Sequence, residues 1–456
     1  MISLGLFMIS LDNSILYTAL PAISAQLNTT PTQALWIINA YPLVLCGLLL
    51  GSGSLGDKVG HRVMFLAGLA LFGLASLGAA FAPSAPALIV ARGLLGMGGA
   101  VMMPATLALI RLTFADEQER NTAIGIWSSV AVVGAAAGPL IGGALLEFFW
   151  WGSIFLINVP ISVIAVALTV WLAPENMPNP NKHWDAISSL FALAALSGLT
   201  ITIKEAANPE RSLVLLVIAA VIAVIGGCCF THRQRRLPEP LLTFDIFRSR
   251  LFTGGVIAAA GSIFVLIGAE LQTVQKLQLV DAFTPLHAGL TVVAMAAAAF
   301  PASVLGGVNL HRVGFLPLVA GGFAGAAVGA ALLVWGSMQQ NFVLEVGALA
   351  VLGFSAGSVM SVSSIAIIGA APLHRSGMAA GVEEVSYEFG TLLTVAITGS
   401  LLGRWLALGV TRDTYAAAYT GAYHQVLAVL AVAAVALAAV TWWCFRDNPK
   451  SGDLVT

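Results

Sequence analysis

Long apolar runs follow one another along almost the whole chain, separated by short polar segments. A bilayer core of about 30 Å is crossed by about 20 mostly apolar residues in a helix, and the sequence holds fourteen runs of that kind. Because backbone groups in lipid must form hydrogen bonds within the segment, we expect helices and not the alternating strands of a barrel. The predicted spans cover residues 2–24, 34–55, 64–83, 87–110, 122–145, 153–173, 185–203, 212–230, 251–273, 285–307, 315–337, 343–369, 378–403 and 421–445.

The Lys and Arg residues between these runs predict the orientation, because cytoplasmic connections carry the excess of positive charge. With a cytoplasmic N-terminus, most cations fall in cytoplasmic connections, Arg92 lies within a span, and few cations lie outside. We therefore expect both termini in the cytoplasm. The cations predicted for the outer connections are Lys204, Arg211, Lys276, Arg404 and Arg412.

Composition supports a membrane protein. Apolar residues make up 59% of the 456 positions and charged residues 9%, whereas a water-soluble domain carries roughly 25% charged residues. The balance of 20 Lys and Arg against 21 Asp and Glu excludes a basic nucleic-acid-binding protein. Four cysteines lie in apolar runs without metal or redox spacing, so no metal site is expected.

An internal repeat predicts the domain organisation of this all-α membrane protein. Residues 53–60 and 307–314 share the pattern of Gly, three residues, a polar residue, a cation, one residue and Gly. A repeat on the same side of the membrane fits two six-helix bundles related by an axis along the membrane normal, with two helices inserted between them. We predict an N-terminal bundle over 1–173, a linker with two inserted helices over 174–250, and a C-terminal bundle over 251–456.

The polar loop after the second span carries the first family motif. Gly53, Asp57, Lys58, Gly60 and Arg62 stand in an order that resembles the loop signature of the major facilitator superfamily. The glycines allow a tight turn. The Asp57 carboxylate could pair with a cation or a helix N-terminus and so latch the cytoplasmic side in one state. The alternative is that this segment only connects two spans and has no latching role.

The fifth predicted span carries a second motif. Gly134, Gly138, Pro139, Gly142 and Gly143 form an arrangement similar to the one that marks the antiporters of this superfamily. Small residues let a neighbouring helix approach closely. Pro139 removes one backbone hydrogen bond and bends the helix.

Further segments extend the resemblance over nearly the whole chain. Residues 11–21, 36–41, 91–96, 155–160 and 382–390 resemble the fourteen-span drug:proton antiporters, and among them the SmvA- and QacA-like methyl-viologen and quaternary-ammonium exporters. The resemblance implies the major facilitator fold in a bacterial-type inner membrane. It implies a multidrug efflux antiporter, not an enzyme, that exports lipophilic organic cations by alternating access. The proton gradient would supply the energy without a cofactor, and we expect a monomer.

Two other functions stay open on the sequence. A facilitator for a different amphipathic substrate, such as an anion, peptide or metabolite, is compatible with a core Arg92 that could bind a carboxylate. A membrane enzyme or channel has less support, because the sequence contains no HExxH and no phosphate-binding loop.

Ionisable residues within the spans are the candidates for coupling, because a charge in a bilayer is costly. A buried carboxyl group can hold a proton when its site is empty and release it when a cation lies beside it. Glu384 and Glu388 share one helix face. We assign proton coupling to these two, to Arg92 and to Asp12, the acid that the resemblance places in the first helix.

Structural roles remain open for some of these residues. The Asp12 carboxylate could form a hydrogen bond that stabilises helix packing, or it could pair with Arg92. Arg92 could neutralise one carboxylate and have no part in a proton relay. Glu270, near the outer end of its span, could extend to the interface.

Acidic and aromatic side chains are the candidates for cation binding, because aromatic faces attract quaternary ammonium groups. Tyr387 follows Glu383 by four residues, so the two lie side by side on a helix. Asn39 stands where some relatives have an acid, and residues 294–300 contain none, which leaves dication export open. The predicted substrate-binding residues are Glu383, Glu270, Tyr41, Trp36, Trp127 and Tyr387.

Overall fold

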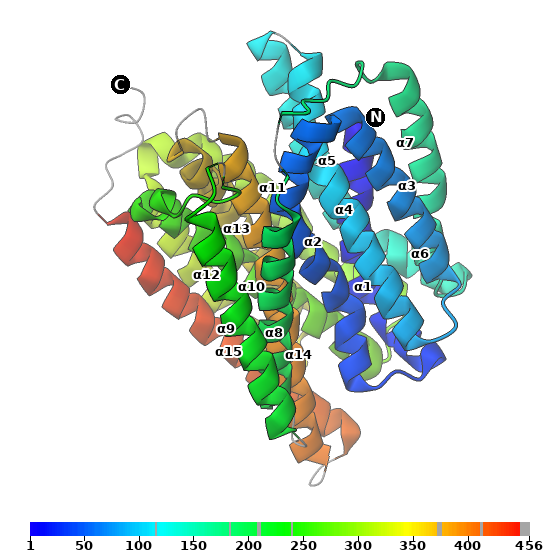
Figure 1. Cartoon of the computed structure of the whole chain (residues 1–456). Helices are drawn as coiled ribbons and strands as arrows, with labels where there is room; N and C mark the ends of the chain where they lie inside the picture. Colours follow the sequence, from blue (N-terminus) through cyan, green and yellow to red (C-terminus); the bar gives the residue numbers. More distant parts are fainter. Residues whose placement is uncertain are drawn as a thin grey trace. The chain divides into compact units, whose positions relative to one another are not determined.

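The computed structural model of the chain is built of helices (Figure 1), and no strand occurs in the residues that it describes, which are 1–114, 116–181, 184–207, 211–238, 240–371, 376–410 and 414–446. All fourteen predicted spans coincide with helices, the sixth being divided at Ile157. The predicted all-α fold is confirmed. The elements are α1 (Ile2–Leu27), α2 (Pro31–Val59), α3 (His61–Ala80), α4 (Ala85–Thr113), α5 (Glu117–Phe148), α6 (Ser153–Leu156), α7 (Asn158–Leu172), α8 (Ala186–Ala207), α9 (Leu213–Gln234), the 3-10 helix η1 (Phe244–Arg248), α10 (Arg250–Leu279), α11 (Pro285–Val313), α12 (Phe315–Met338), α13 (Phe342–Gly369), α14 (Ser376–Val410) and α15 (Tyr415–Phe445).

Length and composition qualify most of these helices as membrane spans. Thirteen described helical segments are long and apolar enough to cross a membrane, with α6 and α7 together forming one of them. Helix α5 is not among these thirteen and holds a shorter apolar segment, Val133–Phe148. The whole of α5 is nevertheless helical.

Local capping explains where several helices begin. Thr30 precedes α2 and its hydroxyl accepts from the backbone N–H of Gln33 at 3.2 Å, while the Gln33 side chain accepts from the Thr30 N–H at 3.0 Å. Pro31 occupies the first helical position, where its missing N–H costs nothing. Asn341 caps α13 through a bond from the Leu344 N–H at 3.1 Å.

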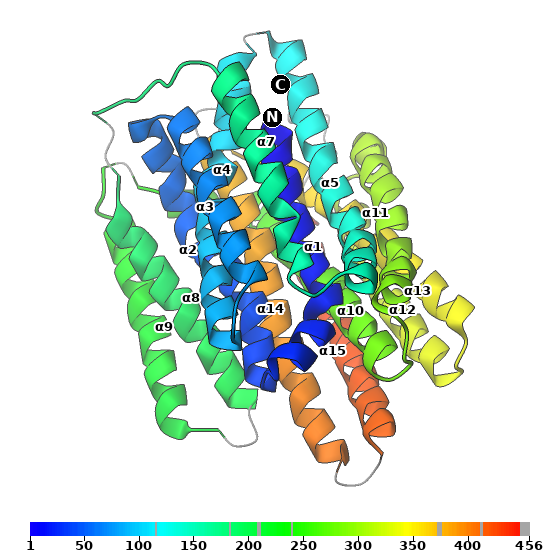
Figure 2. The ribbon, with the colours of Figure 1, turned by 90° about the vertical axis from the view of Figure 1, so that its right-hand side faces the viewer.

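The first compact unit comprises residues 1–206, 211–242 and 283–289. Within it α1 packs against α5, and α4 packs against both α2 and α3. Helices α8 and α9 belong to this unit and lie side by side in Figure 2. The predicted division at residues 173 and 250 stays a prediction.

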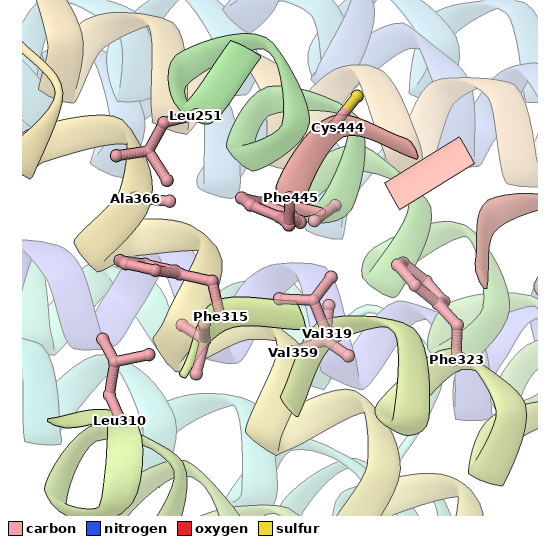
Figure 3. Packing of buried hydrophobic residues seen from close by; sticks show 11 residues of the cluster. Leu251, Leu310, Phe315, Val319, Phe323, Val359, Ala366, Cys444 and Phe445 are labelled. Carbon is pink, nitrogen blue, oxygen red and sulfur yellow. The ribbon is translucent and has the colours of Figure 1, made fainter. Parts of the chain in front are cut away.

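The second compact unit comprises residues 207–210, 243–282 and 290–456. Helix α10 contacts α13, α14 and α15, and α12 contacts α13 and α15. An apolar cluster joins several of these helices (Figure 3), with the rings of Phe315 and Phe445 stacked at 5.8 Å between centroids and 10° between planes. These contacts hold the first turn of α12 against the last turn of α15.

The sequence repeat has a counterpart in the backbone. Gly60 has φ 100° between α2 and α3, and Gly314 has φ 88° between α11 and α12. Side-chain-bearing residues rarely adopt that region, so glycine is required at both turns. Within the described residues, these two are the glycines with positive φ.

Helices α8 and α9 form a closely packed pair within the first unit. A Cβ atom on Gly198 would lie 2.5 Å from the backbone nitrogen of Ala223, and one on Gly226 would lie 2.8 Å from that of Ala195. The side of α9 away from α8 is exposed, for example at Val214, Val217 and Val224. That face has the composition of a lipid-facing surface.

A bidentate ion pair closes one end of this helix pair. Arg233 donates to both carboxylate oxygens of Asp185 at 2.9–3.0 Å. Burial raises the pKa of Asp185, but the hydrogen bonds from Arg233 and Ser188 outweigh it and hold the pKa below its usual range. The residue before α8 is thereby tied to the last turn of α9.

Three cations assigned to outer connections lie instead in helices. Lys204, Lys276 and Arg404 fall within the ends of α8, α10 and α14. The prediction was wrong there because apolar runs mark the bilayer core, whereas a helix continues into the polar region beyond it. Arg211 lies between α8 and α9 as predicted, and Arg412 is outside the described residues.

Candidate functional site

Asp12 and Arg92 form an ion pair in the interior of the first unit. Arg92 Nη1 donates to Asp12 Oδ2, and both side chains are 1% exposed. Asn158 Nδ2 donates to Asp12 Oδ1 at 2.9 Å and lies 3.3 Å from the hydroxyl of Ser76. The carboxylate on α1 therefore has donors from α4 and α7. This is the pairing that the sequence left open, and proton exchange at Asp12 stays a prediction.

The rest of the Arg92 guanidinium is also engaged. Its Nε donates to the Ile37 carbonyl at 3.1 Å. Its central carbon lies 4.8 Å from the ring centroid of Tyr41 and 6.0 Å from that of Phe155. Tyr41 is fully buried, so this predicted substrate-binding ring faces a cation of the chain itself.

The loop motif forms a sharp turn, in which the carboxylate of Asp57 contacts a histidine that is near in the chain. Asp57 Oδ1 lies 3.1 Å from Nε2 of His61, one turn further along, and Asp57 is half-exposed. A Cβ on Gly53 would lie 3.8 Å from the Cβ of Pro104, and Lys58 is exposed. Asp57 is thus placed at a protein surface, as a latch requires, while the latching role itself stays a prediction.

The segment that follows α7 lies against this loop. Arg62 donates to the carbonyl of Val170 at 2.8 Å and lies 3.4 Å from that of Pro174. Asn176 Nδ2 donates to the Val59 carbonyl at 2.8 Å, and its Oδ1 accepts from the Val63 N–H at 3.3 Å. Sequence reasoning missed Asn176, because a polar residue in a linker carries no signal of a distant partner.

The antiporter motif on α5 brings two other segments of the first unit close. A Cβ on Gly138 would lie 2.4 Å from the Cβ of Ser14, whose hydroxyl donates to the Ala135 carbonyl at 2.7 Å. A Cβ on Gly143 would lie 2.6 Å from the Cα of Leu286. The predicted close approach is present at these positions.

The other residues of the antiporter motif on α5 also lie close to neighbouring helices. Gly134 faces α1, where a Cβ would lie 3.0 Å from the Phe7 carbonyl oxygen. Gly142 also faces α1, at Ile15. Pro139 lies inside α5, and its carbonyl approaches Gly289 at the start of α11.

Three acids lie within two turns of α14 in the second unit. Glu383 is 9% exposed, and Tyr387 Oη donates to its Oε1 at 3.2 Å, as the spacing of four predicts. The same hydroxyl lies 3.3 Å from the Met360 carbonyl of α13. Glu388 is also 9% exposed, and Glu384, one turn before it, is partly exposed. The cluster therefore combines three carboxyl groups with one aromatic hydroxyl.

The other predicted substrate residues lie on three different helices. Glu270 lies on α10 and is partly exposed. Trp127 on α5 is 8% exposed, and its indole N–H has no hydrogen-bond partner in the part of the chain that the structure describes. Trp36 on α2 contacts the ammonium group of Lys204, 4.1 Å from its ring centroid. Asn39 is fully buried.

Sequence reasoning also missed a polar cluster in the second unit. Lys276 Nζ lies 2.8 Å from Asp281 Oδ2 and 3.5 Å from Glu345 Oε1. The ring of Tyr423 lies 5.9 Å from the same nitrogen. Lys276 on α10 and Asp281 just after this helix are close in the chain, but Glu345 on α13 and Tyr423 on α15 are distant from them, so no local spacing could bring all four together.

The family follows from comparison with known proteins. The model of the Major Facilitator Superfamily matches residues 2–382. The methyl viologen resistance protein SmvA of Salmonella typhimurium (strain LT2) is 36% identical over 87% of this chain and 80% of its own. The multidrug efflux pump LfrA of Mycolicibacterium smegmatis is 36% identical over 88% and 79%. The tetracenomycin C resistance and export protein of Streptomyces glaucescens is 32% identical over 88% and 74%.

Solved structures share the fold. A bacterial homologue of the human lysosomal transporter Spinster, inward-facing and unoccupied, matches with a TM-score of 0.68 and 16% identity over 98% of this chain and 96% of that one. A D-xylose–proton symporter matches with a TM-score of 0.66 and 14% identity over 99% and 97%. With its apolar helices, the chain is a multi-pass protein of the bacterial inner membrane, a transporter and not an enzyme, and it belongs to the major facilitator superfamily.

Proposed function

We propose that the chain is a proton-coupled multidrug antiporter that exports lipophilic organic cations. The observation that carries this proposal is the 36% identity, over most of both chains, to a methyl viologen resistance protein and to a multidrug efflux pump. Methyl viologen is an organic dication, so the first relative's name points to positively charged substrates. We further propose that the chain works as a monomer with the proton gradient as its energy source and without a cofactor.

The distribution of buried acids supports cations over anions. Glu383 and Glu388 are each 9% exposed on α14, and Glu384 lies between them. Carboxylates within a membrane protein are costly, so they persist where they bind protons or cations. The core Arg92, in contrast, is engaged with Asp12 and is not available to bind an anionic substrate in this conformation.

The acid cluster permits exchange by competition. A carboxyl group among apolar helices favours its protonated form, and a cation beside it favours the ionised form. Protonation therefore releases the drug, and drug binding releases the proton. Exchange across the membrane follows when the site is open to one side at a time. We assign Glu384 and Glu388 to proton and cation exchange, and Glu383 with Tyr387 to cation binding.

Membrane energetics set a requirement on dication export. Moving one charge against 100 mV costs about 2.3 kcal/mol, so a dication costs about twice that amount. Two inbound protons cancel this electrical term. The cluster on α14 and Asp12 together offer more than one carboxyl group for that purpose.

Ethidium efflux from cells that express the chain tests the proposal. We expect ethidium-loaded cells to lose the dye, and an uncoupler to abolish the loss. The Glu384→Gln variant should insert normally and fail to export. Glu147→Gln, which changes an exposed acid on α5, is the matched control and should export normally. Efflux that persists after the proton gradient has collapsed would contradict the proposal.

A further inference from the structure

A lysine from the inserted helix α8 lies on the face of Trp36. Lys204 is 8% exposed, and its ammonium nitrogen lies 4.1 Å from the centroid of the Trp36 ring on α2. That nitrogen has no hydrogen-bond partner in the part of the chain that the structure describes. The neighbouring acid, Glu205, is engaged elsewhere and accepts from the backbone N–H of Ser212.

The packing of α8 against α2 determines this contact. A Cβ on Gly47 would lie 2.9 Å from the Cβ of Leu193, and one on Gly51 would lie 2.0 Å from the hydroxyl oxygen of Ser189. These contacts and the contact of Trp36 with Lys204 follow one antiparallel register along the two helices. The two glycines therefore bring the backbones together and place Lys204 opposite Trp36.

The ammonium group is held weakly for a buried charge. A desolvated cation needs a counter-ion or several acceptors to offset the loss of water, and an aromatic face supplies only part of that compensation. A quaternary ammonium or phosphonium ion has a smaller hydration penalty, because it has no N–H donors to leave unsatisfied. Such an ion therefore suits the Trp36 face better than Lys204 does.

We propose that Lys204 is a tethered cation that occupies an organic-cation site on Trp36, and that a substrate cation displaces it. This inference rests on the proposed export of organic cations and names one aromatic contact of the substrate. The inserted helix α8 then lowers the affinity for the substrate, because each binding event must move the lysine away. A lower affinity at this position favours release of the substrate.

Binding of tetraphenylphosphonium to the purified full-length protein tests the inference. We expect Lys204→Met and Lys204→Gln to bind this probe roughly fivefold more tightly than the wild-type protein, because a competing cation is absent. Lys204→Arg keeps the tethered charge and should bind like the wild type. Arg211→Met removes an exposed positive charge between α8 and α9 and serves as the control for general electrostatics.

A second substitution shows whether Trp36 is the site. Adding Trp36→Leu to Lys204→Met should remove the gain in affinity. An unchanged Kd in Lys204→Met and Lys204→Gln, or a gain that persists without Trp36, would overturn the inference and leave the proposed function intact. A wild-type protein and variants that all fail to bind the probe would overturn both. Thermal unfolding of each variant confirms that the compared proteins are folded.

Discussion

Arg92 of α4 donates to the carboxylate of Asp12 of α1, and neither side chain is more than 1% exposed. Removing one partner of such a pair leaves a buried charge alone and costs about 3–5 kcal/mol, whereas removing both can cost little. The pair therefore offers a way to separate a structural role of Asp12 from a role in proton exchange.

The first prediction compares single and double variants of this pair. Asp12→Asn should abolish export and lower the free energy of unfolding by about 3–5 kcal/mol, because Arg92 loses its counter-charge. Asp12→Asn combined with Arg92→Gln should regain most of the stability without regaining export. Thermal unfolding and ethidium efflux measure the two properties. Export by the double variant would show that the pair is structural alone.

The second prediction concerns the α14 acids. Glu384→Gln and Glu388→Gln should each block export, because neither amide can exchange a proton. Tyr387→Phe removes the hydrogen bond to Glu383, which is worth about 0.5–3 kcal/mol, and should raise the KM for ethidium with a smaller effect on the maximal rate. Efflux kinetics in cells with matched expression provide the measurement. Wild-type kinetics in both Gln variants would exclude this cluster from coupling.

The third prediction tests the close packing at the antiporter motif. Gly138→Ala places a Cβ 2.4 Å from the Cβ of Ser14, and overpacking of this kind costs about 1–3 kcal/mol. Both stability and export should fall. Gly421→Ala on α15, where a Cβ meets nothing within 4 Å among the residues that the structure describes, is the control. It should be neutral or stabilising by up to about 1 kcal/mol. Equal behaviour of the two variants would refute the packing role.

The fourth prediction concerns the segment after α7. Asn176→Ala removes two hydrogen bonds to the loop between α2 and α3, each worth about 0.5–1.5 kcal/mol. Hydrogen exchange over residues 174–181 should therefore become faster. Asn181→Ala, which changes an exposed side chain in the same segment, should leave the exchange unchanged. If exchange in Asn176→Ala also stays at the wild-type rate, these bonds do not hold the segment.

The helices could be predicted from the sequence because lipid imposes a length and an apolar composition on each of them. The repeated turn could also be predicted, because Gly60 and Gly314 are marked by the same neighbours in the chain. The ends of the helices were harder to predict from the sequence. Lys204 and Lys276 lie in helices that continue past their apolar runs, where hydropathy carries no signal.

The residues of the candidate site could be predicted from the sequence, but the contacts that they make with other helices could not. Spacing along one helix indicated the approach of Tyr387 to Glu383. Spacing could not choose a partner for Asp12, because Arg92 and Asn158 come from other helices. For the same reason, the contact of Lys204 with Trp36 could not be predicted, since a contact between α2 and α8 depends on tertiary packing.

Transport by the purified protein in liposomes tests the central claim most directly. Vesicles that contain the protein are given an imposed pH gradient, acidic inside, and the accumulation of ethidium is followed with and without a protonophore. We predict accumulation that depends on the gradient, stops with the protonophore and is absent in Glu384→Gln vesicles. Accumulation of the dye at the same rate after the gradient has been dissipated would contradict proton-coupled export.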